Sequence, residues 1–438
     1  MSDIRLPAGV RDFLPRAAAR RRAIAERLLE TFEAWGYQRL ITPVFECADV
    51  LERGLGADAR AAAIRFVEPG SGEVVALRPD ITPQVARIVA TRLADVDGPI
   101  RLCYEGAVNR LPQPGTGPLA QRELLQAGIE LIDAGSPDGD AEALAVAAAA
   151  LATTGLEHVR LDVGHVAPAK WVLGQAPDAL AREKLKTALS RKDKAAVAKA
   201  ATALPSTARE AAEALPRLWG PARDVLDRAR HLKWPHEVEV ALGELADVLA
   251  AAGPLVEPTL HDEVTIDLGE VRGFEYYTGI RFAGWADGAA DAIVRGGRYD
   301  ELVGRYGRAA KATGFAVDIE AIATAQRASG MAPPAGATSV LFHAEGKQRQ
   351  VAHRLARALR GKGFRAAVDL AHREHKQGLP AYGKGVGFDV IVELGRAPKA
   401  IETTTGKASK LDAAAIERAL AGDAAALAQG LRRIACPS

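Results

Sequence analysis

Apolar and polar positions alternate with helix-like and strand-like periods along much of the chain. Apolar residues recur at the spacing of one helix face from Arg16 to Trp35, and Gly36 follows where a helix ends. Thr82 is expected to cap a second helix over 84–93, with Pro83 at its first position. Strands are predicted over residues 39–41, 74–77, 100–104, 124–132, 159–163, 264–268 and 274–282. A helix follows over 140–154, and residues 314–322 are predicted to pass from a buried strand into a helix.

The amino-acid composition and the apolar periodicity change twice along the sequence. Residues from about 167 to 253 are rich in Ala, Leu, Lys and Arg and contain few strand signals, which indicates a helical insertion. The segment Met331–Gly336 has the composition of a linker. Beyond it, strands and helices alternate, which is typical of a small α/β domain. We therefore expect a core over residues 1–330 and a second domain over residues 337–438.

Composition narrows the class of protein only moderately. The 438 residues include 57 Lys and Arg against 55 Asp and Glu, so the chain has no overall attraction to nucleic acid. Its 3 cysteines are far apart, which favours a reducing compartment. A secretory signal and an apolar run of about 20 residues are both absent from the sequence. We expect a cytoplasmic protein without membrane contact.

The segment Leu77–Pro83 places an acidic residue and a hydroxyl two positions apart. If this proline-flanked segment is extended, Asp80 and Thr82 point the same way. A carboxylate beside a hydroxyl suits an ammonium group, which needs charged and neutral acceptors. A capping Thr beside a surface Asp explains the same residues.

The strand predicted near residue 128 has one polar face. Gln126, Gly128 and Glu130 share that face, while the residues between them share the other. The central glycine leaves room for a small ligand between an amide and a carboxylate. A solvent-exposed strand face is the alternative interpretation.

An arginine and two adjacent tyrosines occupy the segment 271–279. Arg272 offers a carboxylate clamp, and Tyr276 offers an aromatic wall on the same strand face. Strict alternation places Tyr277 on the opposite face, so a bulge or twist is needed to bring it to the same pocket. A tyrosine-rich core strand is the alternative.

Further motifs bear on whether the chain binds a cofactor or a metal. Two glycines precede Arg298 and Tyr299, which predicts a close backbone approach or a sharp turn. This segment lacks the signature of a phosphate-binding loop. His372 and His375 have no Cys or acidic partners at ligand spacing. We predict no metal and no cofactor.

Together and in order, these segments resemble the class II histidyl-tRNA synthetase core over about residues 5–325. The similarity begins at Gly9–Pro15, continues through 32–37, 41–46, 77–83 and 126–130, and ends with 272–279 and 296–302. It implies an α+β fold with an antiparallel sheet, a helical insertion and a two-fold homodimer. Residues 337–430 resemble that family's anticodon-binding domain more weakly.

The chain departs from a synthetase where ATP would bind. The second class II motif retains Arg110, but Pro112 stands where a Glu is expected. The third motif has Asp318 in place of Gly and Ala321 in place of the Arg that holds the γ-phosphate. A negative charge beside a triphosphate costs binding energy in a partly dry site. We therefore expect no aminoacylation.

This pattern resembles the regulatory subunit of ATP phosphoribosyltransferase, a non-catalytic member of a glycosyltransferase complex. The resemblance implies a short-form catalytic subunit as partner, L-histidine as effector, feedback regulation of histidine biosynthesis, and no tRNA. Most members of that family lack an anticodon-binding domain, so residues 337–438 are a departure. A working histidyl-tRNA synthetase and a paralogue with another partner are the alternatives.

The resemblance also assigns roles within a histidine pocket. Asp80, Thr82 and Gln126 would take the ammonium group, and Arg272 the carboxylate. Glu130 would accept from the imidazole, and one of the two tyrosines would wall the ring. The predicted histidine-binding residues are Asp80, Thr82, Arg110, Gln126, Glu130, Arg272, Tyr276 and Tyr277.

Overall fold

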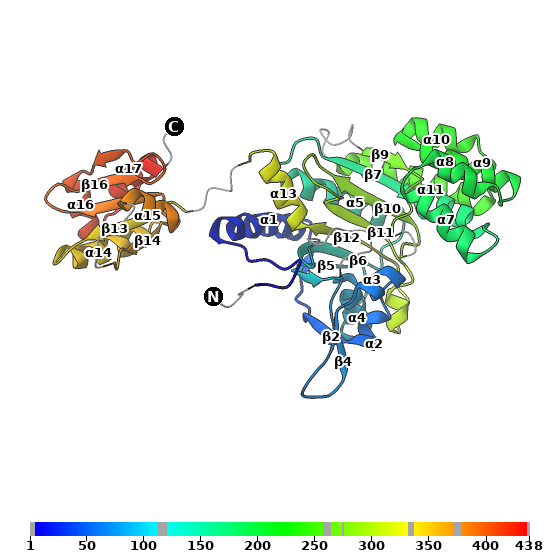
Figure 1. Cartoon of the computed structure of the whole chain (residues 1–438), viewed down its shortest axis with the longest axis horizontal. Helices are drawn as coiled ribbons and strands as arrows, with labels where there is room; N and C mark the ends of the chain where they lie inside the picture. Colours follow the sequence, from blue (N-terminus) through cyan, green and yellow to red (C-terminus); the bar gives the residue numbers. More distant parts are fainter. Residues whose placement is uncertain are drawn as a thin grey trace. The chain divides into compact units, whose positions relative to one another are not determined.

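The computed structural model describes residues 5–111, 121–256, 264–273, 276–331, 337–371 and 378–435. Contacts divide the chain into two compact units (Figure 1). The first contains residues 1–12 and 21–331, and the second contains residues 13–20 and 332–438. Linker residues 332–336 lie outside the described residues, and so do Pro112, His372 and His375. No helix in the described part of the chain is long and apolar enough to span a bilayer.

A nine-stranded sheet forms the centre of the first unit. Its pairs are antiparallel except β1 with β5 and β7 with β9, which confirms the predicted antiparallel α+β core. In spatial order its strands are β1 (Gln38–Arg39), β5 (Ile100–Asn109), β6 (Glu123–Ile132), β12 (Ala312–Asp318), β11 (Val294–Arg298), β10 (Ile280–Trp285), β7 (Arg160–His165), β9 (Val264–Asp267) and β8 (Trp219–Pro221).

Helices cover one face of this sheet and enclose the main core. The covering helices are α1 (Pro15–Ala34), α5 (Asp138–Ala152), α11 (His236–Ala252) and α13 (Ile319–Ala328). The apolar positions predicted for the first helix meet the sheet, since Phe32 packs edge-on against Phe315 with ring centroids 5.6 Å apart. Arg298 and Asp140 form a buried ion pair at 2.8 Å, joining the sheet to α5.

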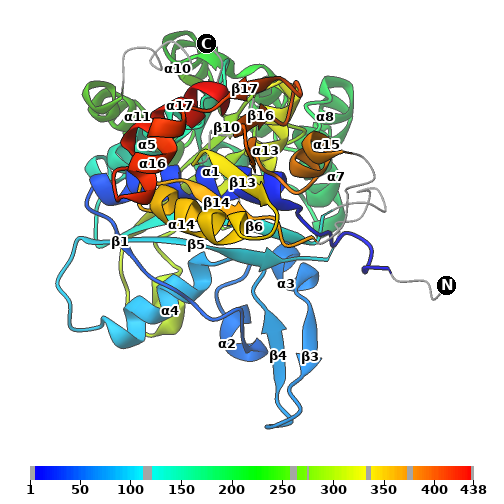
Figure 2. The ribbon, with the colours of Figure 1, turned by 90° about the vertical axis from the view of Figure 1, so that its left-hand side faces the viewer.

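The other face carries a smaller layer. Its elements are α2 (Ala48–Glu52), α3 (Ala57–Ala62), α4 (Thr82–Arg92), the 3-10 helix η3 (Val303–Tyr306) and a three-stranded sheet of β2 (Phe45–Cys47), β4 (Val74–Leu77) and β3 (Arg65–Val67). Figure 2 shows β3 and β4 extending away from the large sheet as a hairpin. Buried residues of α4, including Val85 and Val89, pack with Leu102 and Tyr104 of β5.

The predicted insertion is helical apart from the short strand β8. Its helices, green in Figure 1, gather beyond the β8–β9 edge of the sheet. They are α6 (Val166–Gly174), α7 (Ala179–Ser190), α8 (Lys194–Ala201), α9 (Ser206–Ala214), η1 (Leu215–Arg217) and α10 (Ala222–Arg230), followed by α11 and η2 (Gly253–Leu255).

The second unit is an α/β fold around a five-stranded sheet, as its alternating pattern predicted. In spatial order the strands are β14 (Arg365–Val368), β13 (Ser339–Ala344), β15 (Val390–Leu394), β16 (Lys399–Glu402) and β17 (Ala408–Lys410). The helices are α14 (Gln348–Arg360), α15 (Leu379–Gly385), α16 (Ala413–Leu420) and α17 (Ala425–Ala435). Buried residues of α14, α16 and α17 form one core with the sheet.

Three local predictions were wrong in detail. A strand was expected over 39–41, but the observed strand β1 comprises only Gln38 and Arg39. The strand expected over 274–282 begins only at Ile280, and its first two positions lie outside the described residues. Thr82 is the first residue of α4 and not its cap, because Ile81 occupies the cap position with helical backbone angles.

Candidate functional site

The candidate site lies on the face of the large sheet opposite the main helical layer. Register places Glu130 of β6 opposite Gly314 of β12. Gly314 in turn opposes Gly297 of β11, which opposes Arg281 of β10. Directly opposed residues share a face, so one row carries an acid, two glycines and a base. With strands about 4.8 Å apart, the Cα atoms of the acid and the base are separated by roughly 14 Å.

The row of residues forms the floor of the site, and it requires glycine where it approaches neighbouring groups. A Cβ at Gly314 would lie 2.3 Å from Oε2 of Glu130 and 2.7 Å from the hydroxyl of Tyr299. At Gly128, a Cβ would lie 2.4 Å from the carbonyl oxygen of Phe315. Side-chain atoms do not approach so closely, so any substitution forces these groups apart. The two glycines in the 295–302 segment mark a close approach, as predicted, since a Cβ at Gly297 would lie 2.4 Å from the Ile280 carbonyl oxygen.

A cavity of about 320 Å³ stands above this floor. This is the size of a small-molecule site. Seven of the eight predicted residues line it: Asp80, Thr82, Arg110, Gln126, Arg272, Tyr276 and Tyr277. Glu130 lies behind this lining, with its Oε2 beside Gly314, which does line the cavity. Sequence reasoning did not assign Lys186, Arg281, Arg295, Tyr299 and Asp318 to the pocket, although they also line it.

Two arginines hold the loop that carries Asp80. The buried guanidinium of Arg78 donates to the carbonyl oxygens of Ala107 and Thr42, and Nε of Arg110 donates to the Pro79 carbonyl at 2.7 Å. Oδ1 of Asp80 accepts from the Thr82 backbone N–H at 3.3 Å. Asp80 and Thr82 therefore reach one cavity through a turn into α4, and not through the extended segment that the prolines predicted.

Glu130 is fully buried at the end of the glycine row. Its side of β6 is not solvent-exposed, because Gln126 is 7% and Glu130 is 1% accessible. The Tyr104 hydroxyl donates to Oε1 of Glu130 at 3.2 Å. Among the described residues, Oε2 has no hydrogen-bond partner. Burial raises the pKa of the Glu130 carboxyl well above its ordinary value, because the charged form is deprived of water.

Three further polar atoms near this carboxylate are buried without partners in the described structure. They are Oε1 of Gln126 and the hydroxyls of Tyr276 and Tyr299. Each such atom costs about 1–3 kcal/mol unless a ligand or water bonds to it. A carboxylate, an amide oxygen and two hydroxyls can together accept from a ligand with several N–H donors.

The paired tyrosines reach the cavity by a turn. The backbone N–H of Tyr276 donates to the Gly273 carbonyl at 3.3 Å, so Tyr276 lies in a turn and not on the strand that alternation predicted. The turn sets the rings of Tyr276 and Tyr277 edge to face at 5.4 Å, and the Tyr276 ring lies 5.2 Å from that of Tyr299. The bulge expected for Tyr277 is unnecessary, because alternation does not apply to a turn.

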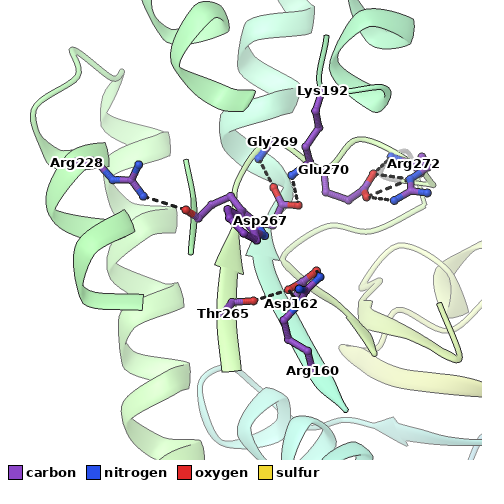
Figure 3. A network of polar contacts seen from close by, with 10 residues as sticks. Arg160, Asp162, Lys192, Arg228, Thr265, Asp267, Gly269, Glu270 and Arg272 are labelled. Atoms are coloured by element: carbon purple, nitrogen blue, oxygen red, sulfur yellow. Dashed lines mark hydrogen bonds and ion pairs between the residues drawn. The ribbon is translucent and has the colours of Figure 1, made fainter. Parts of the chain in front are cut away.

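Arg272 lines the cavity but already has a carboxylate partner. Its Nη2 lies 2.6 Å from Oε2 of Glu270, and its Nε contacts both oxygens of the same carboxylate (Figure 3). The Arg272 side chain is 53% exposed, whereas that of Glu270 is 8% exposed. A ligand carboxylate at Arg272 must therefore share this guanidinium with Glu270.

The third class II motif forms the junction of β12 and α13. Asp318 caps α13 by accepting from the Ala321 backbone N–H at 3.0 Å, and it also lines the cavity. Glu320 forms a buried ion pair with Arg21 at 2.5 Å and a second pair with Arg11 at 3.1 Å. The retained Glu of this motif is thus engaged by arginines near the start of the chain, and the substituted Gly provides a helix cap.

Metal ligands do not gather at this site. No group of three or more His, Cys, Asp or Glu side chains is arranged to hold an ion anywhere within the described ranges. The cavity instead combines acidic Asp80 and Asp318 with basic Arg110, Arg272 and Arg281. Such a lining suits a small zwitterion, which needs partners of both signs.

Comparisons with known proteins agree with this architecture. Residues 9–322 match the family model of histidyl-tRNA synthetase. The chain is 46% identical over 323 residues to an ATP phosphoribosyltransferase regulatory subunit of Anaeromyxobacter dehalogenans, covering 73% of this chain and 90% of the relative. It is 38% identical to the corresponding subunit of Geobacter sulfurreducens, covering 85% of each chain. A solved structure of an ATP phosphoribosyltransferase regulatory subunit/histidyl-tRNA synthetase from Bacillus halodurans superposes with a TM-score of 0.75, at 26% identity, over 90% of this chain and 98% of that one.

The fold and the cavity define a protein of the class II histidyl-tRNA synthetase type. Within that class, the chain belongs to the family of ATP phosphoribosyltransferase regulatory subunits.

The buried Glu130 carboxyl makes the empty pocket less stable at neutral pH. Its folded-state pKa is raised, whereas an unfolded Glu titrates near pH ~4.3. As pH rises through the unfolded pKa, only the unfolded chain loses this proton, so stability falls until the folded pKa is passed. Glu130→Gln should therefore unfold at higher urea concentration than the parent at pH 7, with the difference shrinking toward pH 4. Coincident pH profiles of the two proteins would contradict this account.

Proposed function

We propose that this chain is the non-catalytic regulatory subunit of ATP phosphoribosyltransferase and binds L-histidine in the described cavity. In this role it conveys feedback regulation to a short-form catalytic subunit at the first step of histidine biosynthesis. The names of its relatives support the complex. The site supports the ligand, because the cavity offers complementary groups to each end of an amino acid.

One observation carries the proposal. Buried acceptors without partners surround Gly314, while Asp318 and Ala321 occupy the positions where a synthetase would hold triphosphate. The amino-acid part of the ancestral pocket is therefore complete, and its nucleotide part is changed. Free histidine can bind the amino-acid part of the pocket without any contact to the nucleotide part.

The roles follow from the donors and acceptors of histidine. Its ammonium group donates to Asp80, Thr82 and Gln126, which line one side of the cavity. An imidazole N–H donates to Oε2 of Glu130, and the tyrosine rings enclose the imidazole. The carboxylate of histidine binds the guanidinium of Arg272.

Arg110 has a supporting role in this arrangement. It lines the cavity and holds the Pro79 carbonyl beside Asp80, so it orients the ammonium site and need not touch the ligand. With Asp318 close by, this end of the cavity is electrically balanced and does not attract a nucleotide.

Glu130→Ala and Arg272→Ala should each weaken L-histidine binding by on the order of a hundredfold or more. Truncating one partner of a buried charged hydrogen bond costs about 2–5 kcal/mol, and the half-exposed Arg272 guanidinium meets this condition only when the ligand covers it. Isothermal titration calorimetry measures the loss. Arg160→Ala is a matched control, because Arg160 is paired with Asp162 at 2.9 Å and does not line the cavity.

Parent-like affinity in both pocket variants would place the ligand elsewhere. The same preparations should leave histidine-dependent pyrophosphate exchange and tRNA aminoacylation at background. Robust exchange by the parent protein would support a working histidyl-tRNA synthetase instead.

The parent chain should bind a transferase that lacks its own regulatory domain. A pull-down measures assembly, and transferase assays with and without L-histidine measure its consequence: activity should require this chain and fall when histidine is added. Glu130→Ala should still assemble, because its side chain faces the pocket and not the protein surface. Transferase activity that is independent of this chain, or insensitive to histidine in its presence, would exclude the regulatory role.

We also propose a two-fold homodimer formed through the three-stranded sheet. Exposed apolar side chains gather on and beside it: Ile41, Val44, Phe45, Phe66, Val67 and Val74. Ile41 is 88% and Val67 is 61% accessible, and the rings of Phe45 and Phe66 meet at 5.7 Å. Apolar surface of this kind is typically covered by a partner, and a two-fold axis covers the same patch on both copies.

Val67→Asp should convert the dimer to a monomer, because burying its charge in an apolar interface is unfavourable. Sedimentation equilibrium measures the mass. Leu180→Asp is the matched control, since Leu180 is 65% accessible but lies on α7 in the insertion, away from this patch. A Val67→Asp variant that remains dimeric would move the interface elsewhere.

A further inference from the structure

Arg281 is a buried cation without a partner. It is 7% accessible, and its guanidinium forms no hydrogen bond or ion pair with the described residues. Other buried arginines of the sheet and its loops behave differently. Arg298 pairs with Asp140, and Arg78 donates to backbone carbonyls. Arg281 is therefore an exception to the rule that buried charges are paired.

The acidic groups near Arg281 are already engaged. Glu270 and Asp267 act on it electrostatically. Glu270 binds Arg272 through two guanidinium nitrogens, and Asp267 pairs with Lys192 of the insertion (Figure 3). Neither carboxylate is within hydrogen-bonding distance of Arg281. Among the described residues, its charge is thus compensated only at a distance, and Arg281 lines the cavity.

Arg281 lies at one end of the cavity, away from the acid. It lines the cavity and opposes Gly297, two strands from Gly314 and three from Glu130. The ring of Tyr277 lies above the glycine between them, since its Cδ1 is 2.9 Å from the position of a Cβ on Gly297. Tyr277 therefore stands between the two ends of this row. We call the end at Glu130 the acidic compartment of the cavity and the end at Arg281 the basic compartment.

Other cations border the basic compartment. Arg295 shares its strand face with Arg281, because it opposes Ala283, two positions along β10. Lys186 of α7 lines the same cavity from the insertion. A guanidinium presents five N–H donors in a planar fork that matches two oxygens of a carboxylate or phosphate group. Donors of this kind, buried and unsatisfied beside a cavity, complement an oxyanion.

We propose that Arg281 is the principal ligand of a small oxyanion, a carboxylate or a phosphate group, bound in the compartment beyond Tyr277. The oxyanion has two possible sources. If it is the carboxylate of bound histidine, Arg281 takes the part assigned above to Arg272, and the inference rests on the proposed function. If it is a free phosphate group, the inference is independent of histidine binding.

The test compares the full-length parent with Arg281→Met. In the first arm, thermal unfolding is followed in chloride and in inorganic phosphate at equal ionic strength. Without an oxyanion, the Met variant should have a Tm roughly 2–4 °C higher, because it lacks an unpaired buried charge. Phosphate should raise the Tm of the parent if a phosphate group is the ligand, and should leave that of the variant unchanged.

In the second arm, calorimetry compares L-histidine with L-histidinol, which has a hydroxymethyl group in place of the carboxylate. If the carboxylate is the ligand, the parent should prefer histidine by on the order of tenfold or more, and the Met variant should lose that preference. Arg295→Met is the matched control. Arg295 lines the same cavity but is half-exposed and paired with Asp291, so its variant should behave like the parent in both arms.

The inference is overturned if the Met variant matches the parent in its phosphate response and in its histidine preference, or if it is less stable than the parent without an oxyanion. Arg281→Lys decides the question should the Met variant not fold. It keeps the charge but loses the fork, so the oxyanion effect should be reduced and not abolished. Failure of histidine to bind at all would contradict the proposed function, while the phosphate arm would still decide the role of Arg281.

Discussion

The close approach of β12 to Glu130 is the constraint on which the site depends. A side chain at Gly314 would collide with both Oε2 of Glu130 and the Tyr299 hydroxyl. Because position 314 is a glycine, these two groups can approach its backbone, and the space that a side chain would fill is part of the cavity. Gly297 extends the same floor toward Arg281. The sheet thus provides a ligand-sized space without any break in its hydrogen bonding.

Two buried ion pairs lie outside the cavity, while several groups in or beside the cavity lack partners among the described residues. Arg298 with Asp140 and Arg21 with Glu320 are buried ion pairs that join distant segments of the chain. Glu130 and Arg281, by contrast, are buried with incomplete hydrogen bonding among the described residues. Burying such groups without partners reduces stability, which supports the ligand that we propose for this cavity.

The nucleotide end of the pocket has acquired a structural role. Asp318 caps α13, so its carboxylate is held at the end of β12, within the cavity lining. Ala321 donates the capped N–H and contributes only a methyl group. Asp318 and Ala321 thus form the N-terminal cap of α13 at the positions where the family motif carries Gly and Arg. The change borders the candidate amino-acid pocket, because Asp318 opposes Gln126 in the β12–β6 register, whereas Glu130 and Gly314 form a different row.

Much of this organisation was predictable from the sequence alone. Periodicity located the helix that carries Phe32, the strand that carries Glu130 and the helical insertion, because one element's own residues determine its buried face. Family motifs identified seven residues that line the cavity. Periodicity could not show that Tyr277 enters it through a turn, or that Thr82 begins a helix. Nor could it show that Arg281 lacks a partner among the described residues, because pairing depends on register between strands that are far apart in the chain. Only the tertiary structure sets that register, and with it which charges are satisfied and which await a ligand.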